Sequence, residues 1–71
     1  MPEVEGPIRR FNNQGFEVVI GTTRLRCSTT LWQNFKRNFK EGDYVIAEYT
    51  LFGIDETKVA RNMVRREDLR P

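Results

Sequence analysis

The chain has 71 residues, of which 38% are hydrophobic and 31% charged, with a net charge of +2. A chain of this length cannot divide into two units that each bury enough apolar surface to offset lost conformational entropy. One cysteine and no histidine exclude a disulfide framework, a zinc cluster and histidine acid–base chemistry within this chain. We therefore expect one domain over residues 1–71, with an ordered core from about residue 5 to 66 and flexible ends.

The sequence also argues against membrane insertion and catalysis. No apolar run approaches the roughly 20 residues of a transmembrane helix, so we expect no membrane partner. The first residues, MPEVEGP, lack the basic and apolar stretches of a secretory signal, and we expect a cytoplasmic protein. No nucleophile–base pair, paired carboxylates or glycine-rich phosphate loop occurs, so the sequence predicts neither an enzyme nor a bound cofactor or metal.

The cations are concentrated in two regions of the chain. Residues 24–40 contain five cations and no acid, and residues 58–71 contain five cations against two acids. The acids between these regions are Glu41, Asp43, Glu48, Asp55 and Glu56. Clustered cations say more about a partner than the net charge does, and they predict a phosphate-binding surface.

The first elements in chain order form a predicted hairpin. Residues 6–11 and 16–21 flank NNQG, whose Asn and Gly residues tolerate the positive φ values of a tight turn. In the second strand, Phe16, Val18 and Ile20 share one side, because side chains alternate along a strand. We expect this side to face the core.

The segment RLRCS, residues 24–28, predicts a third strand. Leu25 and Cys27 share one side, and we expect both in the core, with a structural role for the thiol. The two-residue period then sends Arg24 and Arg26 to the outer face. Their exposure is thus a consequence of the register.

After the third strand the apolar period changes to that of a helix. We expect a hydroxyl residue at 28–30 to cap its start, and Gly42 to end it in a left-handed conformation. Several cations near this end suit the negative pole of the helix dipole. The apolar stripe consists of Leu31, Trp32, Phe35 and Phe39.

Two further strands follow. Residues 43–52 predict a long strand, 53–57 a loop and 58–66 a last strand, in which conflicting apolar parities indicate a bulge or a partly helical end. The order β-β-β-α-β-β fits an all-β, five-stranded OB-fold barrel, with a short helix between strands three and four. Closure removes the unpaired sheet edges.

OB-folds bind oligonucleotides across strands two and three and the adjoining loops, through cations and stacked aromatic rings. Phe11 and Phe52 are the candidates for stacking, with burial in the core as the alternative for each. Trp32 is a further candidate, either for stacking or as an exposed anchor for a protein partner. A protein-interaction module is therefore one alternative function.

Three segments carry a resemblance to a known family. They are EGPIRRFNNQGFEVVI, then RLRCS leading into TTLWQNFKRNFKEGDYVIAEYT, and finally LFGIDETKVARNMVRR. In this order they resemble the S1-type OB-fold proteins of translation initiation, bacterial initiation factor one and its counterpart initiation factor one A. RRFNNQGF also resembles the first hairpin of cold-shock proteins, which makes general binding of single-stranded nucleic acid the other alternative.

The resemblance to initiation factors implies a monomer that binds RNA of the small ribosomal subunit, with other initiation factors as further partners. Residues 29–33, TTLWQ, depart from the strongly basic start that this segment has in the family. The RNA-binding residues implied by the resemblance are Asn34, Lys36, Arg37, Lys40, Arg61, Arg65 and Arg66, to which Arg24 and Arg26 are added.

Overall fold

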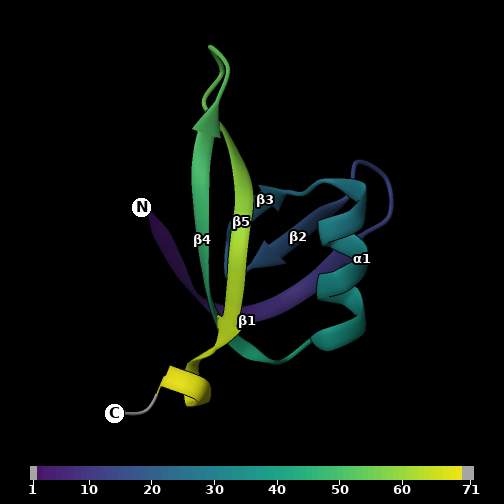
Figure 1. Ribbon diagram of the computed structural model, residues 1–71, viewed down its shortest axis with the longest axis vertical. Helices are drawn as coiled ribbons and strands as arrows, with labels where there is room; N and C mark the ends of the chain where they lie inside the picture. Colours follow the sequence, from purple (N-terminus) through teal and green to yellow (C-terminus); the bar gives the residue numbers. More distant parts are fainter. Residues whose placement is uncertain (1, 70–71) are drawn as a thin grey trace.

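The computed structural model describes residues 2–69, so Met1, Arg70 and Pro71 of the predicted flexible ends lie outside it. Figure 1 shows the predicted order of elements. Within the described residues, no helix has the length and apolar character needed to cross a membrane. The elements are β1 (Glu3–Asn12), β2 (Glu17–Ile20), β3 (Thr23–Arg26), α1 (Thr29–Asn38), β4 (Tyr44–Phe52), β5 (Thr57–Arg65) and the 3-10 helix η1 (Arg66–Leu69).

The five strands close into a barrel in the order β1-β2-β3-β5-β4, and β4 pairs with β1. Neighbouring strands are antiparallel except for β3 and β5, which run parallel and meet at the single pair Arg26 and Val59. The prediction of an OB-fold-like barrel with a helix between β3 and β4 is therefore confirmed. The β4–β5 hairpin extends beyond the rest of the barrel, at the top of Figure 1.

The core lies inside the barrel and follows the predicted alternation of side chains. Val18 pairs with Leu25 and with the inward-facing Phe11, so three strands contribute to one inward row. Full burial of an aliphatic side chain stabilises the fold by about 1.5–3 kcal/mol. The residues of the core cluster are Ile8, Val18, Ile20, Leu25, Phe35, Val45, Ala47, Ala60 and Met63.

Helix α1 begins as predicted and ends earlier than predicted. Ser28 is the N-cap, and its Oγ accepts the N–H of Leu31 at 3.2 Å. The helix stops at Asn38 because Phe39 turns to extended backbone, φ −129°, and packs edge-to-face on Phe35. Gly42 does adopt a positive φ of 95°, but in the turn that enters β4. The expectation that Gly42 ends the helix was wrong.

A bulge in β5 resolves the conflicting parities of that strand. Glu48 faces Asn62 while Tyr49 faces Ala60, so Arg61 is an extra residue with no partner across the hairpin. This insertion turns both Ala60 and Met63 inward although they are three residues apart. The predicted bulge is confirmed, and η1 follows the strand directly.

Two positions near the barrel end differ from the prediction. Phe16 lies outside β2, in the β1–β2 turn at φ +53°, where its ring contacts Trp32 edge-to-face at 5.4 Å. Cys27 lies after β3 and is half-buried against the core. Both residues still serve packing, but from connecting segments outside the strands, where strand alternation no longer sets the side-chain direction.

Candidate nucleic-acid interface

A groove of about 610 Å³ lies between the end of β3, the start of α1 and the β4–β5 hairpin. We call it the hairpin groove. It unites three of the residues predicted from the sequence, Arg26, Arg61 and Phe52. Its lining residues are Arg26, Cys27, Ser28, Phe52, Gly53, Asp55, Thr57, Val59 and Arg61.

The strand register explains how these residues meet. Arg26 faces outward because Leu25 faces the core, and its pair with Val59 sets β3 beside β5. β3 ends at this pair, whereas the hairpin continues past it. On the hairpin, Phe52 faces Thr57 and has 73% of its surface exposed. Two arginines, Arg26 and Arg61, and the exposed ring of Phe52 therefore line the hairpin groove.

The electrostatics of the groove favour an anion. The two ion pairs within residues 2–69 belong to Arg65 and Arg66, so neither Arg26 nor Arg61 forms an ion pair there. Asp55 is the single acid against these two arginines in the lining. The first turn of α1, which begins at the groove, contains no acid, so its positive dipole end is uncompensated there.

Two further exposed arginines, Arg10 and Arg24, lie on the outer face of the barrel. Val19 pairs with Arg10 on β1 and Arg24 on β3, so two exposed arginines flank one half-buried valine. Arg26 lies one row further along β3 and faces Glu17. Arg24 thus occupies the outer position expected from the sequence.

Helix α1 carries a second set of predicted residues. Asn34, Arg37 and Lys40 are exposed, Lys40 lying just after the helix. Lys36 is partly engaged, since its Nζ lies 4.9 Å from the Trp32 ring centroid and 3.4 Å from Asn13 Oδ1. A rise of 1.5 Å per residue places the Arg37 backbone about 13 Å along the axis from the groove-lining Ser28. The helix residues and the groove are therefore separate contact regions.

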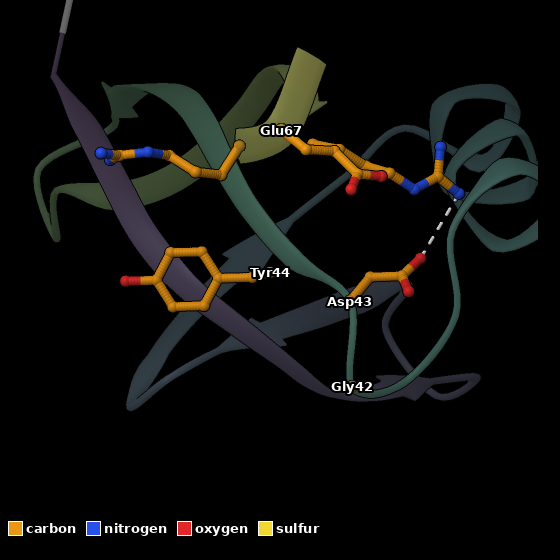
Figure 2. Close-up of a pocket in the computed structure, with 6 residues that line it drawn as sticks. Gly42, Asp43, Tyr44 and Glu67 are labelled. Atoms are coloured by element: carbon orange, nitrogen blue, oxygen red, sulfur yellow. Dashed lines mark hydrogen bonds and ion pairs between the residues drawn. The ribbon is translucent and has the colours of Figure 1, made fainter. Parts of the chain in front are cut away.

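A second hollow, of about 450 Å³, lies at the opposite end of β5 (Figure 2). We call it the Asp43 pocket, and Gly42, Asp43, Tyr44, Arg65, Arg66 and Glu67 line it. Arg65 Nη2 donates to Asn38 O at 2.6 Å and to Asp43 Oδ2 at 3.4 Å. Arg66 pairs with Glu5 at 2.6 Å. The two predicted arginines therefore already have partners within the protein.

Trp32 and Phe11 lie inside rather than on the surface. Trp32 is 7% exposed, and its Nε1–H donates to Glu17 O at 3.1 Å. Phe11 is half-buried and contacts the Trp32 ring edge-to-face at 6.4 Å. The expectation that Trp32 is an exposed anchor or a stacking residue was wrong, because its ring fills the space between α1 and the β1–β2 turn. Among the stacking candidates, only Phe52 presents a free ring.

The sequence did not predict that Ser28, Asp55 and Cys27 line the groove. Asp55 lies in the β4–β5 turn and Ser28 is the N-cap of α1, so the fold brings together lining residues that are distant in the chain. Burial raises the pKa of the groove-lining Cys27 thiol to about 11.

Comparisons of the chain with protein-family models, with curated proteins and with solved structures found no significant match. The barrel topology and the residues of the groove are therefore the basis for assigning a function.

Proposed function

We propose that the protein is a non-catalytic RNA-binding protein that holds a single-stranded segment in the hairpin groove. The observation that carries this proposal is one lining shared by the exposed ring of Phe52 and by Arg26 and Arg61, neither of which forms an ion pair within residues 2–69. They lie between β3 and the β4–β5 loop, the region that OB-folds use for oligonucleotides. The arrangement suits phosphates and one base at the same time.

Each group has a physical role in this proposal. Arginine forms charge-assisted hydrogen bonds with phosphate oxygens, and it stays charged at all relevant pH values. Stacking of a base on an aromatic ring contributes about 1–3 kcal/mol and does not depend strongly on the base. The arginines Arg10 and Arg24 extend the cationic surface for the adjoining nucleotides.

The test is the salt dependence of binding to a fluorescent oligouridine of about eight nucleotides, a length within the site sizes of OB-folds. Each phosphate contact with a single strand lowers the slope of log affinity against log salt by about 0.7. Two groove arginines therefore predict a slope of about −1.4 or steeper. A slope near zero, or no binding at low salt, contradicts the proposal.

A second candidate function is binding to structured RNA of the small ribosomal subunit, as the resemblance to initiation factors one and one A implies. The exposed helix residues Asn34, Arg37 and Lys40 favour it. Arg65 and Arg66 favour it less, because each is already ion-paired.

Two double variants distinguish the candidates. The first is Arg26→Ala with Arg61→Ala, and the second is Arg37→Ala with Lys40→Ala. If single-strand binding is the main activity, the first variant loses oligouridine affinity and the second keeps it. If the ribosomal function holds, co-sedimentation with purified small subunits is lost in the second variant and largely kept in the first.

A further inference from the structure

The acid in the hairpin groove has no role in holding phosphates. Asp55 lies in the turn between β4 and β5, where Gly53 has φ +82° and its carbonyl accepts the N–H of Glu56 at 3.2 Å. A methyl group built on Gly53 would lie 3.0 Å from Asp55 Oδ1. The carboxylate therefore folds back over Gly53, which follows the groove-lining Phe52 in the chain.

A carboxylate at this position repels a phosphate backbone, so its presence calls for another partner. Within residues 2–69, Asp55 takes part in neither ion pair, which leaves its charge uncompensated by a cation of the protein. An ionised carboxylate only accepts hydrogen bonds, and it accepts two in parallel from a matched pair of donors. The donors of a stacked base are then the natural partners.

The four RNA bases differ in the donors they offer. Guanine presents N1–H and an N2 amino group side by side on its Watson–Crick edge, which matches the two oxygens of a carboxylate. Adenine and cytosine each present one amino group beside an acceptor, and uracil presents one N–H between two acceptors. An acceptor facing a carboxylate oxygen is repelled. The donor pattern of the four bases thus favours guanine as the partner of a carboxylate in this groove.

We propose that the hairpin groove contains a guanine subsite, in which the base stacks on Phe52 and gives its N1–H and N2 hydrogens to Asp55. Arg26 and Arg61 hold the adjoining phosphates. This inference rests on the proposed single-strand binding and adds a base preference to it. Glu56, the next residue, is exposed and does not line the groove, so it supplies a matched control.

The experiment compares four oligouridines of about eight nucleotides that carry one central guanosine, inosine, adenosine or cytidine, measured by fluorescence anisotropy. We expect the guanosine oligomer to bind at least about fivefold more tightly than the others, the lower end of what a bidentate contact provides. Inosine lacks the N2 amino group, so it should lose most of this advantage.

The variant Asp55→Asn should change the affinities in opposite directions. Guanosine binding should weaken, because the amide pairs poorly with two donors, while binding of the other oligomers should strengthen as a negative charge is removed. Glu56→Gln also removes a negative charge from the turn, but it should keep the preference for guanosine. Circular dichroism checks that each exposed turn variant remains folded.

The outcomes separate this inference from the proposed function. If all four oligomers bind equally and Asp55→Asn strengthens them all alike, the guanine subsite is wrong and single-strand binding stands. If Glu56→Gln loses the preference as Asp55→Asn does, the preference arises from charge rather than from a base contact, and the subsite is wrong. If no oligomer binds at low salt, the proposed function itself fails.

Discussion

The hairpin groove and the Asp43 pocket contain similar side chains in different electrostatic states. Each is lined by two arginines and by an exposed aromatic ring, Phe52 in the groove and Tyr44 in the pocket. Among the residues that the structure describes, the groove arginines form no ion pair, whereas Arg65 and Arg66 are paired with Asp43 and Glu5. Whether an arginine is available to a ligand is thus decided by its neighbours in the fold.

The paired arginines have a structural function instead. The guanidinium of Arg65 lies 4.8 Å from the Phe39 ring centroid while it bonds to Asn38 O and Asp43, so one side chain ties the end of α1 to β5 and the turn before β4. A phosphate at this arginine would have to displace a carboxylate. The comparison therefore predicts binding phenotypes in the groove and stability phenotypes in the pocket.

The largest expected effect is the loss of RNA affinity in the double variant Arg26→Ala with Arg61→Ala. A hydrogen bond to a charged group contributes at least about 1.5 kcal/mol, so losing two should weaken oligouridine binding about 100-fold. The salt slope should also become shallower by about 1.4. Fluorescence anisotropy measures both quantities.

The matched control is the double variant Arg65→Ala with Arg66→Ala, which removes the same net charge. We expect less than about a threefold change in affinity, because neither arginine is free in the folded protein. Equal losses in the two double variants would mean that net charge, rather than the groove, governs binding.

The second prediction compares Phe52 with Phe11, which the sequence alone made equal candidates for stacking on a base. Phe52→Ala should weaken oligonucleotide binding by about 1–3 kcal/mol and leave stability unchanged, because its ring is exposed. Phe11→Ala should instead lower the free energy of unfolding by about 2 kcal/mol, less than the roughly 3–5 kcal/mol of a fully buried ring. Chemical denaturation and anisotropy on both variants check this, and a stability loss in Phe52→Ala contradicts it.

These contrasts also show what the sequence could and could not predict. Alternation and helical spacing predicted the element order, the outward Arg24 and Arg26, and the bulge in β5. They failed at Trp32, because its ring packs on Phe11 of β1 and Phe16 of the β1–β2 turn, which are distant from it in the chain. They also failed to separate free from paired arginines, because Arg65 and Asp43 become neighbours only when the barrel closes.

A third prediction tests the structural role of Arg65. Arg65→Ala should lower the free energy of unfolding by about 1–2 kcal/mol, since a charged hydrogen bond and a cation–π contact are lost together. For a domain of this size each kcal/mol lowers Tm by about 4–8 °C. Arg66→Ala should cost less than about 1 kcal/mol, because its ion pair is solvent-exposed. Thermal and urea unfolding measure both, and the opposite ranking contradicts the proposed link between α1 and β5.

The smallest expected effect is a pH dependence of the folding stability that arises from the Cys27 thiol. Cys27 lines the hairpin groove but not the Asp43 pocket. Burial raises its pKa from 9.0 to about 11. Between these pH values the unfolded chain loses the thiol proton while the folded protein keeps it. The contribution to stability is therefore fully present below pH 9 and is lost as pH rises through about 11. Solvent screening of the half-buried thiol keeps this loss small.

Alkylation of Cys27 measures the same shift and reports on the groove. At pH 8, a pKa raised from 9.0 to about 11 lowers the thiolate fraction about 100-fold, so iodoacetamide should react far more slowly with the folded protein than with the urea-unfolded chain. The alkylation rate of the folded protein should keep rising up to about pH 11, and a plateau just above pH 9 would contradict the shift in pKa.

The same reaction also reports on the groove. Because the Cys27 thiol borders the groove, saturating oligouridine should slow the alkylation further. The Arg26→Ala and Arg61→Ala double variant should lose this protection at the same RNA concentration, whereas Arg65→Ala should keep it.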